Sequence, residues 1–278
     1  MKFLRDKPLI GAFVVLILYI IFLAIPVFLV IPFIFQFYDF NYISSLFLNF
    51  ALIFGFLLLF LLVIIPYVLR LPLQFKHYSG FLENVGILKL KPRKNILVIT
   101  LAGILLYFIF ALIGSLLLGQ KSFDFLVLFQ PPTRERNGLF SFVRQLRPGI
   151  CEELAFRGII LPLLLTKYSE KTAVTINGFL FGIMHFINLL QGAALFSTIF
   201  QVIYATVFGI TFAIIFKRTK SLIPPIIIHY LINIFSNVFY QATGTFTDIF
   251  VSIFLVGIMI PSMIMILLAK RLKINKHD

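Results

Sequence analysis

Long apolar runs constrain this chain more than any other feature of its sequence. Each is close to the ~20 residues that a helix needs to cross the hydrocarbon core of a bilayer. Helices and closed barrels are the only spanning structures that pair all of their own backbone groups, and these runs lack the alternating pattern of barrel strands. The sequence therefore predicts an all-α, polytopic transmembrane helical bundle. Seven runs are clear, at residues 9–35, 46–69, 96–118, 172–190, 194–216, 222–241 and 248–269.

Composition agrees with a membrane-embedded chain. Hydrophobic residues make up 61% of the sequence, charged residues 12%, and the mean hydropathy is +1.07, which would leave a soluble globule little polar surface. The net charge of +14 comes from 24 lysines and arginines clustered in the short gaps between apolar runs. That placement is typical of loops beside a bilayer, so we expect membrane lipid as a partner and no nucleic acid.

A shorter apolar segment, about 149–166, raises the expected number of transmembrane helices to about eight. Alternating loops from a cytoplasmic start then place both termini in the cytoplasm. The basic segment 119–148 would lie outside, and its amphipathic stretch FSFVRQL suggests an interfacial or re-entrant piece. The N-terminus begins like a secretory signal, but its apolar run is long and lacks a clear cleavage site. We expect it to be a retained spanning helix.

The stretch RPGICEELAFRG, residues 147–158, places three ionisable side chains in an apolar setting. Pro148 favours the start of a helix, and the positive end of a helix dipole favours acidic residues in its first turn. Glu153 and Arg157 are four residues apart, so they can pair on one face, while Glu152 points about 100° away and stays free. Cys151 is the single cysteine, which excludes an internal disulfide, and we interpret it as a small apolar filler.

Two histidines lie in apolar runs. His185 follows the small residues Gly178 and Gly182, which let another helix approach closely. His229 and Asn233 are four residues apart and share a helix face. Each group taken alone could serve as a polar contact between helices.

Taken together, the polar groups favour function over packing. Three different helices supply a carboxylate, an imidazole, and an imidazole with an amide, and each is costly to bury without a partner. A shared cavity would satisfy them all. It would hold a general base, a second proton-handling group and donors for an oxyanion, which are the groups needed to hydrolyse an amide.

The order of three short motifs resembles the CPBP family, which comprises the CAAX proteases and the bacteriocin-processing enzymes also called Abi proteins. The resemblance covers roughly residues 149–240. It implies an intramembrane endopeptidase with eight helices and a water-filled cavity. The motifs are EExxxR at Glu152, Glu153 and Arg157, FxxxH at Phe181 and His185, and HxxxN at His229 and Asn233.

The resemblance also implies a role for each motif residue. Glu152 looks like the general base that activates water, assisted by His185. His229 and Asn233 look like the pair that stabilises the oxyanion. Structural support is implied for Glu153, Arg157 and Phe181. We expect one integral membrane domain over 1–278, with N-terminal helices in 1–120 and catalytic core helices in 140–241.

A metal-dependent mechanism is the first alternative. No HExxH motif occurs, so the usual two-histidine helix of a zinc peptidase is missing. Glu152, His185 and His229 could still form a three-ligand zinc site with an open fourth position. We favour no cofactor, because Asn233 beside His229 suits an oxyanion hole better than a zinc ligand.

Two further function classes stay open. One is a proton-coupled transporter, because such proteins also use acidic residues and histidines inside the membrane. Against it, we find no inverted repeat, and the ionisable residues within apolar runs lie in the second half of the chain. A non-catalytic membrane scaffold is the other. The composition, rich in Phe, Ile and Lys, suggests a multi-pass protein of the bacterial plasma membrane. The substrate would be a membrane-associated peptide or membrane-anchored protein, prenylated or not.

Overall fold

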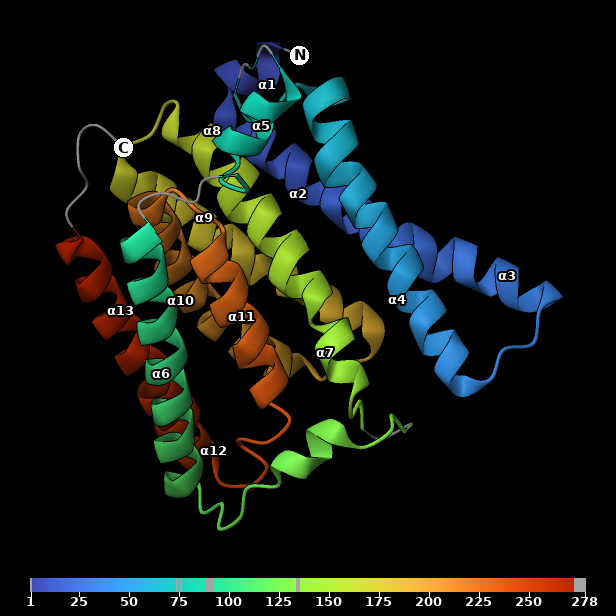
Figure 1. The fold of residues 1–278 in the computed structure, drawn as a ribbon, viewed down its shortest axis with the longest axis vertical. Helices are drawn as coiled ribbons and strands as arrows, with labels where there is room; N and C mark the ends of the chain where they lie inside the picture. Colours follow the sequence, from blue (N-terminus) through green and yellow to red (C-terminus); the bar gives the residue numbers. More distant parts are fainter. Residues whose placement is uncertain (1, 74, 76, 89–92, 134–135, 273–278) are drawn as a thin grey trace.

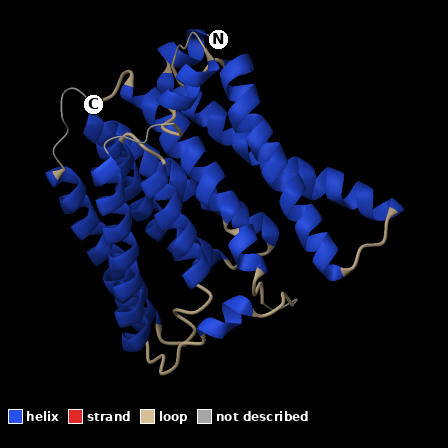
Figure 2. Ribbon diagram, in the orientation of Figure 1, coloured by secondary structure: helices blue, strands red, loops and turns tan. Residues whose placement is uncertain are grey.

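The computed structural model describes residues 2–73, 75, 77–88, 93–133 and 136–272. These residues form helices and loops and no strand (Figure 2). Six of the helices are long and apolar enough to cross a membrane. This confirms the predicted fold class, an all-α polytopic transmembrane bundle. The six spans are Pro8–Phe37, Tyr42–Leu69, Arg93–Leu117, Glu170–Gln191, Leu195–Thr219 and Phe246–Arg271.

Four of the spans change helix type along their length. A π-helical or 3-10 stretch interrupts or ends each of them. The elements are α2 (Pro8–Ile25), η1 (Pro26–Val30) and α3 (Ile31–Phe37); α4 (Tyr42–Leu59) and η2 (Phe60–Leu69); α9 (Glu170–Met184) and η6 (His185–Gln191); and α12 (Phe246–Ile249), η7 (Phe250–Met259) and α13 (Ile260–Arg271). The other two spans are α6 (Arg93–Leu117) and α10 (Leu195–Thr219), and the short helices are α1 (Lys2–Asp6), α5 (Tyr78–Asn84), η3 (Phe125–Phe129) and α7 (Phe140–Arg144).

Two further helical segments carry motifs but fall short of a full span. One is the 148–165 segment, which joins η4 (Pro148–Glu152), η5 (Leu154–Ile160) and α8 (Leu161–Leu165). The other is α11 (Ile223–Phe235), an apolar helix of 13 residues. With these two the segments number eight, but the prediction of eight membrane crossings stays a prediction. The same holds for the division into 1–120 and 140–241.

Prolines account for several of the π-helical stretches. A proline has no N–H to donate, so the helical ladder around it loses a bond and local hydrogen bonding shifts. Pro66 lies inside η2, Pro162 follows η5, and Pro261 follows η7. The segment that begins at Pro148 is itself π-helical through Glu152, where the sequence predicted a plain α-helix.

α11 is shorter than the predicted run of 222–241. Polar side chains after Phe235 bind the last carbonyls of the helix: Ser236 Oγ donates to Asn233 O at 2.7 Å, and Asn237 Nδ2 donates to Ile234 O at 2.8 Å. Such local bonds compete with continued helix. The predicted end at residue 241 is therefore wrong.

Successive long segments run in alternating directions between the two ends of the bundle (Figure 1). α1, α5 and the chain turn before α9 lie at one end, and η3, α7 and α12 lie at the other. α6 and α11 contact each other, and α11 contacts the first turn of the 148–165 segment. The motif-bearing start of that segment thus lies toward the end opposite α1.

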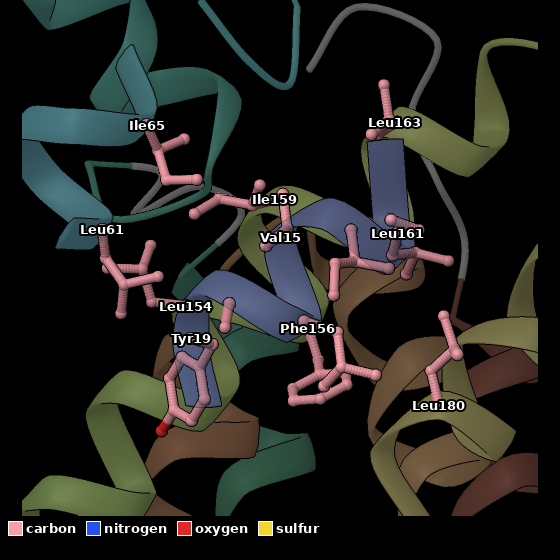
Figure 3. Packing of buried hydrophobic residues seen from close by; sticks show 14 of the residues in the cluster. Val15, Tyr19, Leu61, Ile65, Leu154, Phe156, Ile159, Leu161, Leu163 and Leu180 are labelled. Atoms are coloured by element: carbon pink, nitrogen blue, oxygen red, sulfur yellow. The ribbon is translucent and has the colours of Figure 1, made fainter. Parts of the chain in front are cut away.

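The largest hydrophobic cluster forms where the 148–165 segment packs on α2, η2 and α9. Figure 3 shows its side chains meeting from these elements, including Val15 of α2, Ile65 of η2 and Leu180 of α9. Phe156 and Ile159 are fully buried within it. The apolar side chains of the 148–165 segment are packed in this cluster. Because this packing fixes the segment, it also fixes the position of Glu152 and Glu153.

α9 and α10 make the closest helix contact, and glycines permit it. A Cβ atom added at Gly209 would lie 2.7 Å from Gly178 Cα, so the two backbones touch. Gly182, one turn further, faces Val202 O in the same way. The prediction that Gly178 and Gly182 let another helix approach is confirmed.

Candidate active site

Packing separates the two adjacent glutamates of the 148–165 segment into different environments. Glu153 and Arg157 are fully buried, at 0% exposed, whereas Glu152 is half-buried and lines a cavity. Arg157 Nη1 lies 3.2 Å from Glu153 Oε1, so the predicted four-residue pair is formed. Glu152 is thus the acid left over, as the spacing indicated.

Arg157 is held on several sides. Its Nη2 atom donates to the carbonyl of Gly209 at 3.2 Å, which ties the 148–165 segment to α10. Its guanidinium carbon lies 4.3 Å from the ring centre of Phe181 and 5.4 Å from that of Phe212. Aromatic faces attract a cation most strongly where water is excluded. Arg157 therefore joins three elements around Glu153.

Glu153 also binds His229, a contact that the sequence did not predict. His229 Nδ1 lies 2.8 Å from Glu153 Oε1. The carboxylate can only accept, so Nδ1 carries a proton and the opposite nitrogen, Nε2, is left for other partners. The ring of His229 also packs against Phe212, with centroids 5.9 Å apart. Glu153 therefore sets the orientation of His229.

His185 lies where α9 ends. The α-helix stops at Met184 and His185 begins the 3-10 helix η6, so the histidine is at a junction instead of inside a continuous α-helix. Its Nδ1 atom lies 2.9 Å from the carbonyl oxygen of Phe181. Because a carbonyl only accepts, Nδ1 donates this bond, and Nε2 of the neutral ring is an acceptor.

The predicted polar residues meet in one cavity of about 670 Å³. Glu152, His185, His229 and Asn233 all contribute to its wall. Among the described residues, Glu152 Oε2 is buried without a hydrogen-bond partner. A buried carboxylate oxygen left without a partner is costly unless water or a ligand binds it. Glu152 therefore brings a carboxylate with one unsatisfied oxygen to the wall of this cavity.

Aromatic side chains form much of the remaining wall, and an amide pair forms part of it. Asn188 of η6 and Gln201 of α10 line the cavity and bind each other, with Asn188 Nδ2 donating to Gln201 Oε1 at 2.8 Å. Sequence reasoning missed this pair, although Asn188 follows His185 by one 3-10 turn. The aromatic lining residues are Tyr107, Phe108, Phe181, Phe200, Tyr204, Phe208, Phe212, Phe235, Phe239 and Tyr240.

A metal ion in this cavity would need several His, Cys, Asp or Glu side chains close together. In the part of the chain that the structure describes, no group of three His, Cys, Asp or Glu side chains is close enough to hold one. Glu152, His185 and His229 share the cavity wall without forming such a group.

Comparison with known families identifies the segment that builds this site. Residues 136–235 match the family described as type II CAAX prenyl endopeptidase Rce1-like. We call the matched residues the Rce1-like segment. The match confirms the resemblance to the CAAX proteases and indicates a CAAX-protease-like hydrolase of the membrane. No curated protein and no solved structure matches the chain.

The Rce1-like segment contains all of the motif residues and leaves most of the transmembrane helices outside. It runs from just before α7 to the last residue of α11, so every side chain from Glu152 to Asn233 falls within it. α2, α4 and α6 precede it, and α13 follows it. The chain is thus a multi-pass membrane protein whose cavity is formed largely by its Rce1-like part.

Proposed function

We propose that the chain is an intramembrane endopeptidase that hydrolyses a peptide bond in a membrane-associated peptide or protein. One observation carries this proposal. The side chain of Glu152, one of whose carboxylate oxygens is buried without a partner among the described residues, lines the same cavity as His185, His229 and Asn233. A general base, an imidazole and two oxyanion donors around one space are the groups that amide hydrolysis requires.

In the proposed reaction, Glu152 accepts a proton from a water molecule as the water oxygen attacks the carbonyl carbon of the substrate. Nε2 of His185 accepts the second hydrogen bond of the same water and so orients it. The tetrahedral intermediate then collapses, the C–N bond breaks, and Glu152 returns the proton to the leaving nitrogen. The products are a carboxylic acid and an amine, so atoms and charge balance.

The oxyanion of the intermediate would be stabilised by Asn233 Nδ2 and His229 Nε2. Nδ1 of His229 is already committed to Glu153. In the proposal both nitrogens of His229 carry a proton before the reaction begins, so Nε2–H binds the oxyanion while Nδ1–H keeps its bond to the Glu153 carboxylate, and no proton moves to or from the ring. Glu153 and Arg157 therefore act as positioning residues.

We propose that the reaction requires no metal. Support comes from the donor arrangement, since Glu152, His185 and His229 do not group closely enough to ligate one ion. Dialysis against a strong chelator, followed by metal analysis of the protein, tests this. Activity should persist in metal-free protein, and stoichiometric zinc that restores a lost activity would contradict the proposal.

The substrate class follows from the cavity and the family together. Its aromatic wall suits an apolar group, and its polar motifs suit a peptide bond. The Rce1-like family description names CAAX prenyl endopeptidases, and the motif resemblance extends to bacteriocin-processing Abi enzymes. We propose a bacterial plasma-membrane location, with the basic loops beside anionic lipid headgroups.

The decisive experiment compares wild type with Glu152→Gln in lipid nanodiscs, with a fluorogenic prenylated CAAX peptide and its unprenylated form as probes. Glu152→Gln keeps the shape of the side chain but cannot accept the proton, so hydrolysis should fall to background while thermal stability is kept. Glu170→Gln is the matched control, because Glu170 pairs with Lys217 at the start of α9, away from the cavity wall. Equal activity of wild type and Glu152→Gln would end the assignment.

A further inference from the structure

We propose that Asn188 and Gln201 bind the backbone of the substrate peptide, about two residues from the bond that is cut. The inference rests on the proposed peptidase function and adds a binding element to it. Neither residue belongs to the three motifs, and they come from different elements, η6 and α10.

The 3-10 geometry of η6 places Asn188 beside the proposed catalytic group. A 3-10 helix has about three residues per turn, so side chains three apart lie on the same face. Asn188 is three residues after His185, and both line the cavity. Gln201 faces them from α10, in line with Tyr204, Ala205 and other cavity residues at helical spacing.

The amide pair leaves an unused donor and an unused acceptor at the cavity wall. Asn188 Nδ2 donates to Gln201 Oε1 at 2.8 Å. Asn188 Oδ1 and Gln201 Nε2 make no hydrogen bond to other described residues, and neither is sealed off in the protein. A free carbonyl beside a free N–H is the pattern that one residue of an extended peptide complements, because its N–H and C=O point to the same side.

Neighbouring polar residues on the same wall lack this capacity. The hydroxyls of Ser197 and Thr198 both donate to the carbonyl of Ala194, at 2.8 and 3.0 Å. Their one donor each is therefore used within the first turn of α10. Asn188 and Gln201 therefore offer a peptide backbone more unused hydrogen-bonding groups than Ser197 and Thr198 do.

The rise of the 3-10 helix η6 indicates which residue of the substrate the pair would contact. Three residues of 3-10 helix advance about 6 Å. An extended peptide advances about 3.3 Å per residue, so the group bound by the pair lies about two residues from the carbonyl attacked by the water that Glu152 and His185 bind. The aromatic wall is then left for the apolar side chains or the lipid of the substrate.

The test measures binding, so that it does not depend on turnover. A fluorescently labelled prenylated CAAX peptide is titrated into nanodiscs that carry Glu152→Gln, and a series of analogues replaces one peptide N–H at a time by an ester oxygen. One ester, about two residues from the cleavage site, should raise Kd about 3- to 10-fold, the effect of one net hydrogen bond. Adding Asn188→Leu, which removes the acceptor of that N–H, should raise Kd for the parent peptide and abolish that ester effect. Adding Gln201→Leu, which removes the donor to the peptide carbonyl, should also raise Kd for the parent peptide.

The same series separates binding from a purely structural role. If the pair only ties η6 to α10, Asn188→Leu will raise Kd for every analogue by one common factor and keep the ester effect, which overturns the inference. Thr198→Val is the control, since it removes a cavity-wall hydroxyl already bonded within α10, and the ester effect should survive it. Cleavage by Glu152→Gln protein would count against the proposed function instead, so the two failures are distinguishable.

Discussion

One oxygen atom, Oε1 of Glu153, lies 2.8 Å from Nδ1 of His229 and 3.2 Å from Nη1 of Arg157. A single buried acid therefore joins the proposed oxyanion residue to a buried cation. Arg157 in turn reaches the carbonyl of Gly209 on α10. Three elements are linked through one carboxylate. A substitution at any of these linked residues should therefore alter the cavity.

Arg157→Ala should strongly destabilise the protein. The change leaves Glu153 buried with only His229 as a charged or chargeable partner, and breaking a buried pair by removing one member costs about 3–5 kcal/mol. The expected result is a large fall in folded yield and in the midpoint of thermal unfolding in detergent. Activity per folded molecule should also fall, because His229 loses its fixed carboxylate.

Lys217→Ala is the matched control for a broken ion pair. Lys217 pairs with Glu170, but these side chains are 23% and 44% exposed. Exposed pairs contribute about 0–1 kcal/mol, so this variant should unfold close to wild type. Equal destabilisation by both variants would contradict the view that burial makes the Arg157 pair critical.

His229→Ala and Asn233→Ala should lower kcat with little change in KM. Removing one oxyanion donor typically costs about 10²–10³ in rate, since the donor acts on charge that develops only in the transition state. The double variant should lose less than the product of the two single effects, because residues that act as a unit are not additive. Steady-state kinetics of the three variants on one peptide measures this. A rise in KM alone would assign the two residues to substrate binding.

Much of the site was predictable because it depends on spacing within single helices. The four-residue interval from Glu153 to Arg157 indicated their ion pair, and the interval from His229 to Asn233 placed both on one face. The small residues of α9 likewise indicated its close contact with another helix. Each of these inferences needs only the helical period.

What could not be predicted depends on how helices cross. The bond between Glu153 and His229 joins residues 76 positions apart, and the pair of Asn188 with Gln201 requires η6 to meet α10. The change from α9 to the 3-10 helix η6 also depends on tertiary contacts. The helix η6 then ends at Gly192, which has a positive φ of 84°. Hydropathy alone predicted one continuous run there.

Cysteine labelling should place Arg136 and Lys171 on opposite sides of the membrane. Arg136 lies between η3 and α7, Lys171 lies in the first turn of α9, and both are exposed. The start of α7 and the start of α9 lie at opposite ends of the bundle (Figure 1). The native Cys151 is fully buried, so it should give little background. Arg136→Cys and Lys171→Cys are each treated with an impermeant maleimide on intact cells and on inverted vesicles. Labelling of both from the same side would reject the predicted alternation of crossings.

Gly209→Ala should weaken both the fold and the site. The added Cβ would lie 2.7 Å from Gly178 Cα and 2.9 Å from Gly178 O, and backbone atoms cannot rotate away. Overpacking of this kind costs about 1–3 kcal/mol. Separation of α9 from α10 would also strain the bond from Arg157 Nη2 to Gly209 O, and through Arg157 the contact of Glu153 with His229.

The control for this last variant is Gly55→Ala in α4, where an added Cβ meets no atom within 4 Å. Alanine is favoured over glycine inside a helix by about 0.5–1 kcal/mol, so Gly55→Ala should match or exceed wild type in thermal stability. Gly209→Ala should lower both the unfolding midpoint and kcat. If it lowered the midpoint alone and left kcat unchanged in the folded fraction, the position of α10 would matter for the fold and not for the geometry of the cavity.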